Sequence, residues 1–176
     1  MKRAALKSIL FATVYCVFTI TVKPQTNVSA SSAIRVSVTK GIGISQLSGD
    51  LDLGEVILND AFTTVTKKPG NGLSFEISGS PYKSVIINYS NTELNNSFWI
   101  SKYNGVDGIL NFIPLVEYST DRKFESINPV NNNNCLELNN NNGTGFVYLR
   151  VGGNLQINQN QPAGDYEGQF TITVSY

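Results

Sequence analysis

The 176-residue sequence contains no histidine. Histidine is the commonest general base and metal ligand, and it activates most serine and cysteine nucleophiles. Only two cysteines occur, and Cys16 lies in an apolar N-terminal run that we expect to be removed, so Cys135 has no partner for an internal disulfide. We expect Cys135 to be a small buried apolar residue. These absences favour a non-enzymatic protein without a cofactor or a metal.

The sequence also lacks a block of basic residues. Beyond Ala30 it holds nine basic and 13 acidic residues, which gives a net charge of −4. Nucleic acids and anionic membrane surfaces are bound by positively charged patches. We therefore expect neither of them as a partner.

The N-terminus has the layout of a secretory signal peptide. Met1–Lys7 is basic, Ser8–Val22 is apolar, and Asn27–Ala30 ends in the small residues that a signal peptidase cleaves after. The apolar run is too short and too early for a lasting membrane span, so the mature chain is expected to carry none. We expect a signal peptide at residues 1–30, with cleavage after Ala33 as the second choice, and one domain at residues 31–176.

The rest of the chain consists of short alternating segments separated by Gly, Pro and Asn. Apolar and polar residues alternate over residues 73–77, 85–89 and 147–151, and no stretch sustains a helical period. Many short strands with such turns between them are typical of a sandwich. The sequence predicts an all-β, single-domain antiparallel β-sandwich.

Local patterns predict how some of these strands are joined and covered. Lys68–Asn71 has Pro and Gly at the centre of a type II turn, and Gly152–Gly153 has the form of a two-residue hairpin loop, so each predicts a hairpin. Phe98–Ile100 predicts a short strand. Ile109–Tyr118 is apolar at nearly every position, which predicts a strand covered on both faces, while Pro114 predicts a bulge, a break or an edge there.

The most regular alternation lies at the C-terminus, in Gly164–Tyr176. One face of this strand carries Tyr166, Phe170, Ile172, Val174 and Tyr176. A terminal strand frays unless it is paired, so this strand requires a neighbour. A matching alternation near the start of the mature chain carries Ile34, Val36, Val38, Ile42 and Ile44. We expect the two segments to pair, either within one molecule or between two molecules.

Three other features of the sequence are candidates for a ligand-binding or catalytic site. Four clustered carboxylates are consistent with glycoside hydrolysis or calcium binding, but a solvated strand edge explains them better: Asp50, Asp52, Glu55 and Asp60. Five aromatic residues form either a sugar-binding face or part of the core: Tyr82, Tyr89, Trp99, Tyr103 and Tyr118. The asparagine runs at residues 131–134 and 139–142 predict loops around a short strand, Cys135–Leu138.

Three motifs stand out together: Leu51–Gly54 followed by the strand Leu73–Gly79, the Gly-Gly-x-Leu pattern of Val151–Leu155, and Gly164–Gly168 running into Phe170–Tyr176. With them the chain resembles a secreted bacterial β-sandwich family of unknown function, which is related to the major fimbrillin of the Mat/Ecp common pilus and to the spore coat U domain. The resemblance implies an immunoglobulin-like, pilin-like sandwich. In chaperone–usher pilins, the C-terminal strand edges a groove that the N-terminal segment of a neighbour fills.

The resemblance and the residues together lead to one functional expectation. We expect an exported, non-enzymatic, fimbria-like or cell-surface structural or adhesive subunit, located in the periplasm, on the surface or in a fimbria of a bacterium. Its expected partners are copies of itself or other pilus-type subunits and a periplasmic chaperone. The alternative is a monomeric secreted module that binds a glycan or another ligand. A small hydrolase is a third reading, which the lack of histidine disfavours.

Overall fold

The computed structural model describes residue 33, residues 35–58 and residues 62–176. The predicted signal peptide, Ile34 and Asp60 lie outside the described residues. The chain divides into two units, Met1–Ser37 and Val38–Tyr176. In the first unit, the described residues, 33 and 35–37, are exposed and belong to no helix or strand.

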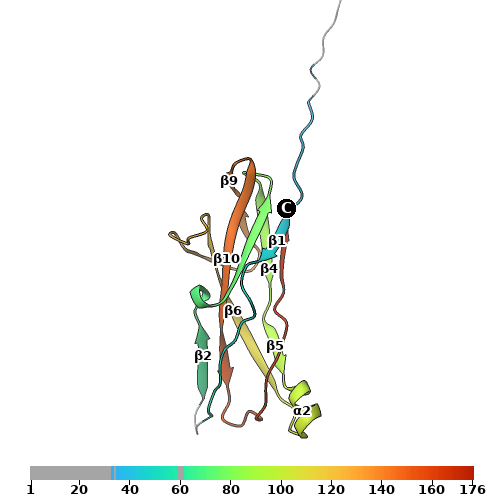
Figure 1. The fold of residues 1–176 in the computed structure, drawn as a ribbon, viewed down its shortest axis with the longest axis vertical. Coiled ribbons are helices and arrows are strands. Elements are labelled where there is room, and N and C mark those ends of the chain that lie inside the picture. The colour runs from blue at the N-terminus through green and yellow to red at the C-terminus, as the bar shows by residue number, and fades with distance from the viewer. Residues whose placement is uncertain (1–32, 34, 59–61) are drawn as a thin grey trace, which may run out of the picture. The chain divides into compact units, whose positions relative to one another are not determined.

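The second unit is mostly β-structure with one short α-helix in its described part (Figure 1). In chain order its elements are β1 (Gly43–Gln46), β2 (Thr63–Lys67), the 3-10 helix η1 (Pro69–Asn71), β3 (Leu73–Gly79), β4 (Ser84–Tyr89), β5 (Thr92–Asn95), α2 (Ser97–Tyr103), β6 (Ile109–Ser119), β7 (Asn128–Val130), β8 (Asn134–Glu137), β9 (Asn139–Asn141), β10 (Thr144–Ile157) and β11 (Ile172–Ser175).

The strands form two antiparallel sheets. The first sheet has the order β1-β3-β10-β6-β5, with β2 and β9 also paired to β10 and β7 paired to β6. The second sheet has the order β11-β4-β8. The prediction of an all-β architecture is therefore confirmed as far as a mostly β fold with two antiparallel sheets.

A main core joins residues from both sheets. The first sheet contributes buried residues such as Ile77 from β3 and Leu149 from β10, and the second sheet contributes Val85 and Ile87 from β4. All four are fully buried. Successive residues of a strand point to opposite faces of the sheet. The apolar positions of the sequence alternation are therefore the ones that face this core.

A second core lies on the first sheet, where β10 ends and β6 begins. It consists of Leu110 and Phe112 from β6 with Leu155 and Ile157 from β10. The irregular segment Leu51–Leu58 covers it, through partly buried leucine and valine side chains. The Leu-Asp-Leu-Gly motif in this segment thus serves to cover a sheet, and the positive φ of Gly54 (80°) permits its turn.

The two predicted hairpins are wrong. β2 and β3 do not pair with each other. They pair one after the other with the same side of β10, and η1 interrupts the chain between them. β10 itself runs straight through Gly152–Gly153. A side chain on Gly152 would meet the backbone of Lys67 and Pro69, and one on Gly153 would meet the Phe112 ring. These two glycines let neighbouring groups approach the β10 backbone closely. A Gly-Gly pair also occurs in hairpin loops, so the sequence alone does not distinguish the two roles.

Three further local expectations differ from the structure. Phe98–Ile100 lies in α2, which is capped at its C-terminal end by Asn104, a residue in left-handed conformation (φ 53°). β6 alternates between buried and exposed residues up to Leu115, so the strand is not covered on both faces there. Cys135 is exposed because the alternation of β8 turns Leu136 inward.

The expectation for Pro114 is confirmed as a local edge. β5 pairs with β6 over Ile109–Phe112 and β7 pairs over Val116–Tyr118, so neither reaches Pro114. On the other side Pro114 pairs with Gly153 of β10. A proline, which has no N–H to donate to a ladder, is tolerated at such an edge.

Candidate functional site: the edge between the first and last strands

The C-terminal strand β11 has one partner strand among the described residues. It pairs antiparallel with β4, with Ile172 opposite Tyr89 and Val174 opposite Ile87. Ile172 and Val174 are half-buried against the main core, whereas Thr173 and Ser175 are exposed. Within the described residues, the other edge of β11 pairs with no strand, although its inward side chains are apolar.

The residues before β11 follow a path between the two sheets. Glu167 forms an antiparallel bridge with Asn95 at the end of β5, with two N–H···O bonds of 2.9 Å. Phe170 is half-buried against the main core and lies 6.4 Å from the Tyr89 ring, centroid to centroid. The C-terminal segment therefore leaves an edge of the first sheet and becomes an edge of the second.

Tyr166 belongs to a different part of the molecule from the other predicted residues of this strand. It packs against the second core, and its hydroxyl donates to the carbonyl of Pro162 at 2.6 Å. The Gln161 side-chain amide donates to the same hydroxyl at 2.8 Å. Tyr166 therefore anchors the segment that leads to β11 and does not line its free edge.

The predicted N-terminal segment is divided between a paired and an unpaired part. Ile44 lies in β1, the edge strand that pairs with β3, and Ile42 is half-buried against the main core. Val36 and Val38 are 85% and 87% exposed, and residues 35–42 belong to no strand. The structure therefore brings Ile42 to the same core as Phe170, Ile172 and Val174, and leaves Val36 and Val38 in solvent.

Tyr176 ties the end of β11 to the start of β1. Its hydroxyl donates to the carbonyl of Lys40 at 2.9 Å and accepts from the N–H of Ser80 at 2.9 Å. The Lys40 N–H donates to Ser80 Oγ at 2.6 Å. A side chain at Gly79 would collide with the Tyr176 hydroxyl, so this approach requires glycine. We call Lys40, Ser80 and Tyr176 the terminal clamp.

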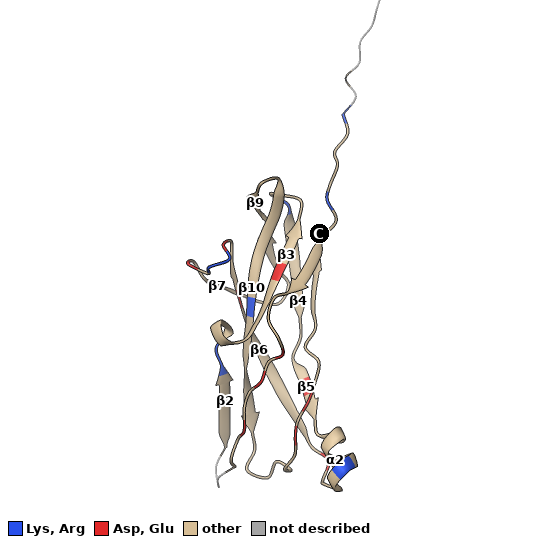
Figure 2. Cartoon of the chain, viewed as in Figure 1, with Lys and Arg blue, Asp and Glu red and all other residues tan. Residues whose placement is uncertain are grey.

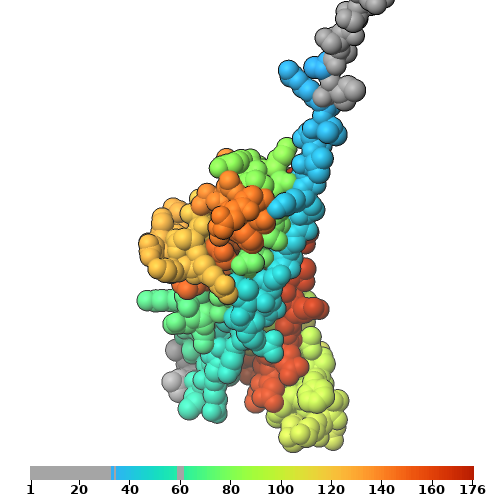
Figure 3. Space-filling view, turned by 45° about the horizontal axis from the view of Figure 1, so that its top comes forward, coloured from blue at the N-terminus to red at the C-terminus, as the bar shows by residue number. Residues whose placement is uncertain are grey.

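Lys40 has a second anchor in its ammonium group. Nζ donates to the carbonyl of Gly143 at 2.7 Å and to Thr144 Oγ1 at 2.8 Å, at the start of β10. Lys40 and Ser80 were not predicted as functional residues, because nothing in the sequence signals bonds across 136 and 96 positions to Tyr176. Figures 1 and 3 show the segment after Lys40 lying beside the C-terminal segment.

The candidate edge is uncharged on its C-terminal side. No Lys, Arg, Asp or Glu occurs in residues 168–176, and in Figure 2 the ribbon that ends at the C-terminus is tan in this last stretch. Behind it, burial raises the pKa of Tyr89, whose hydroxyl donates to the carbonyl of Val130 at 2.7 Å. The edge therefore offers main-chain groups and apolar side chains, which is the chemistry of strand addition.

The other candidate sites are not assembled in the described part of the chain. There, no three His, Cys, Asp or Glu residues gather as metal ligands. The carboxylate of Asp52 accepts from the N–H of Gly54 at 2.8 Å, which stabilises a local turn. None of the helices in the described part of the chain is long and apolar enough to cross a membrane.

The five aromatic candidates do not form one row. Trp99 and Tyr103 contact each other on α2, with ring centroids 5.3 Å apart. Tyr82 is 66% exposed and lies after β3, whereas Tyr89 and Tyr118 are half-buried against the main core. Their positions belong to separate regions of the fold.

Sheets and edge together define a mostly β protein with two antiparallel sheets and an open terminal strand. Residues 123–176 match the model of a family described as a domain of unknown function (DUF4402). The match covers β7 to β11 and includes two of the three motifs on which the resemblance rests, Val151–Leu155 and Gly164–Tyr176. The comparisons found no match among curated proteins or among solved structures.

Proposed function

We propose that the protein is an exported, non-enzymatic subunit of a fimbria-like or cell-surface structure of a bacterium, and that its copies join by strand addition. The N-terminal segment of one copy, with Ile34, Val36 and Val38 on one face, would lie along the free edge of β11 in the next copy. The observation that carries the proposal is the contrast between that free edge, with half-buried Ile172 and Val174, and the exposed valines.

Strand addition would stabilise both the edge of β11 and the segment that is added to it. An edge strand presents unpaired N–H and C=O groups, and an added strand pairs with them while its alternate side chains enter the sheet face. Burying a valine side chain stabilises by roughly 1.5–3 kcal/mol. Val36 and Val38, at 85% and 87% exposure, have nearly all of this stabilisation still to gain.

The terminal clamp supports the donation of the N-terminal segment to another copy, because it fixes Lys40, the point at which that segment joins the folded unit. Lys40 is held by its backbone and its ammonium group, so the residues that precede it start from a fixed point beside Tyr176. Residues 38 and 39, which precede Lys40, are exposed and belong to no strand. Gly43–Gln46, which follow it, pair with β3. The segment before Lys40 is therefore the part available to another molecule.

The same edge accounts for the expected partners. A strand with a free edge and half-buried apolar residues aggregates unless it is covered before assembly. A periplasmic chaperone that lends a strand would provide this cover, and copies of the chain or other pilus-type subunits would replace it. The immunoglobulin-like topology and the kinship with Mat/Ecp fimbrillin and spore coat U belong to this proposal; their support is the motif resemblance and the two-sheet fold.

Two double variants test the proposal in the chain that starts at Ser31. Val36→Asp with Val38→Asp places charges on the face that would enter the neighbour. Ser37→Asp with Thr39→Asp adds the same charge to the opposite face and serves as the matched control. We expect the parent chain and the control to form multimers in sedimentation velocity, and the valine variant to sediment as a monomer.

Either of two results would overturn the proposal. One is a parent chain that stays monomeric at all concentrations measured. The other is a valine variant that assembles as fully as its control, because the apolar face of the segment would then contribute nothing to assembly.

A further inference from the structure

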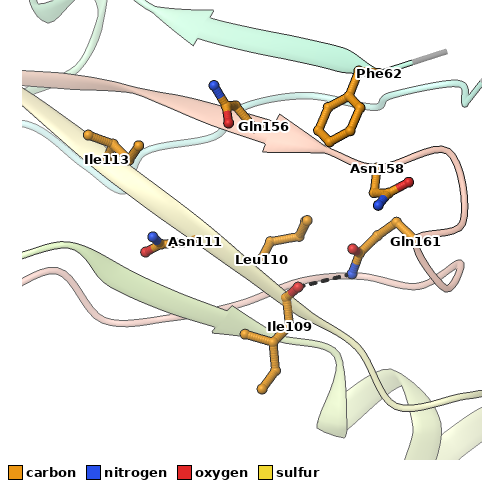
Figure 4. A pocket seen from close by; sticks show the side chains of 8 residues that line it. All are labelled: Phe62, Ile109, Leu110, Asn111, Ile113, Gln156, Asn158 and Gln161. Carbon is orange, nitrogen blue, oxygen red and sulfur yellow. Dashed lines mark hydrogen bonds between the residues drawn. The ribbon is translucent and has the colours of Figure 1, made fainter.

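A hollow of about 290 Å³ lies on the outer face of the first sheet, where β10 ends between the starts of β2 and β6 (Figure 4). The strand alternation assigns its position, because Asn111 and Ile113 of β6 and Gln156 of β10 are exposed while Leu110 and Leu155 are buried in the second core. The hollow therefore opens on the outer face, although Leu110 of the second core also lines it, and it does not include β1 or β11.

The walls of the hollow carry exposed apolar groups. Phe62 is 69% exposed, Ile109 is 58% exposed and Ile113 is 39% exposed. In Figure 4 Phe62 and Ile109 lie on opposite sides of the view; the carbonyl of Ile109 meets Gln161, and its side chain extends away from Phe62. Single exposed apolar residues are ordinary, whereas here three of them line one hollow together with polar side chains.

The polar groups of the hollow are neutral amides. Asn111 and Gln156 make no side-chain hydrogen bond to any residue that the structure describes, so each offers a free donor and a free acceptor. Gln161 is held in place because its amide nitrogen donates to the carbonyl of Ile109 at 3.2 Å and to the Tyr166 hydroxyl at 2.8 Å. Its side-chain oxygen remains an acceptor. None of the eight described residues that line the hollow is charged.

We propose that this hollow binds a neutral saccharide. Sugar hydroxyls both donate and accept, and side-chain amides match both roles. The apolar face of a pyranose ring packs on an aromatic ring such as Phe62. A volume of about 290 Å³ is near the lower end of the range for small-molecule sites and suits a ligand of one or two sugar rings.

The saccharide site goes beyond assembly. It lies on the sheet face and leaves the terminal edge free, so a subunit joined through β11 would still present it to solvent. The surface structure would then carry one sugar site per copy, which makes it adhesive to a neutral glycan.

Saturation-transfer NMR on the full chain tests the site with four probes: glucose, galactose, mannose and N-acetylglucosamine. We expect transfer from the protein to at least one of them, and at least a several-fold loss of the signal in Phe62→Ala and in Asn111→Ala. Phe98→Ala is the matched control, because Phe98 is 70% exposed on α2 outside the hollow. Val36→Asp with Val38→Asp should also leave the signal unchanged, which separates this test from that of assembly.

Three outcomes would overturn the saccharide site. The first is the absence of transfer to all four sugars. The second is a signal that Phe62→Ala does not reduce, or that Phe98→Ala reduces equally. The third is displacement of the sugars from unaltered protein by tetra-alanine, since the hollow would then recognise an extended peptide backbone.

Discussion

Asn96 shows how single buried side chains hold the loops of this protein. It is fully buried, yet both ends of its amide are used: Nδ2 donates to the carbonyl of Val106 at 2.9 Å, and Oδ1 accepts from the N–H of Gly108 at 2.9 Å. These bonds fix the return of the chain from α2 to β6. Ser119, also fully buried, plays a similar part after β6 by donating to the carboxylate of Asp121 at 2.8 Å.

Asn96→Ala should destabilise the fold by roughly 2–4 kcal/mol, because two backbone groups would lose their partner in a buried site. Urea unfolding followed by fluorescence of the single tryptophan measures the change. Asn131→Ala, at an exposed loop position, is the control and should stay within about 0.5 kcal/mol of the parent. Equal stability of the two variants would contradict the role of the buried amide.

The hydrogen bond from Ser119 holds the pKa of Asp121 below its ordinary range, with smaller contributions from backbone N–H groups. A carboxyl whose pKa is lowered on folding stabilises the native state above its unfolded pKa, and this stabilisation is lost as pH falls through the folded pKa. Ser119→Ala should therefore move the pKa of Asp121 upward, as NMR titration of its carboxyl would show. Thr120→Ala, one residue away and exposed, should not. An unmoved pKa in Ser119→Ala would refute this assignment.

At the level of elements, β6 and β10 are the two strands that run through both cores. Each of the two strands changes its outer neighbour at the same height in the sheet. β10 pairs with β3 before Gly152 and with β2 after it, and β6 pairs with β5 before Pro114 and with β7 after it. Gly153 and Pro114 are paired across this level. The main core lies where β3 is the neighbour, and the second core lies where β2 and β5 are.

Gly152→Ala should destabilise the protein by roughly 1–3 kcal/mol, because the new methyl group would meet the backbone of Lys67 and Pro69 and no flexible side chain can yield. Thermal unfolding measures the effect. Gly49→Ala is the control, since nothing lies within 4 Å of a side chain there. A parent-like melting temperature for Gly152→Ala would show that β10 is not packed against η1 at this point.

The elements also show what the sequence can predict here. The alternation of β3 and of the first half of β10 gave correct strands, because one face of each is buried and the period is visible locally. Gly152–Gly153 was read as a loop because the reason for these glycines lies in Lys67, Pro69 and Phe112, which are distant in sequence. The sequence does not identify β4 as the partner of β11 for a related reason. β4 and the N-terminal segment carry the same alternation, and tertiary packing decides which of them pairs.

For the whole molecule, the two ends of the Val38–Tyr176 unit meet at the terminal clamp. β1 is an edge of the first sheet and β11 is an edge of the second, and the clamp holds Lys40 beside Tyr176 without pairing the two strands. A copy built in this way offers one apolar edge and one exposed alternating segment. Our account is that the segment of each copy fills the edge of another.

The most direct test of this account is an isotope-resolved disulfide cross-link. Ser37→Cys, on the outward face of the segment, is combined with Thr173→Cys or with Ser175→Cys, both exposed on β11. The background is the chain that starts at Ser31, which lacks Cys16, with its remaining cysteine removed by Cys135→Ser. Chains labelled with ¹⁴N and ¹⁵N are mixed before assembly and oxidised, and the linked peptides are read by mass spectrometry. The account predicts linked peptides that combine both isotopes. Links that always join peptides of one isotope, or no link at either position, would contradict it.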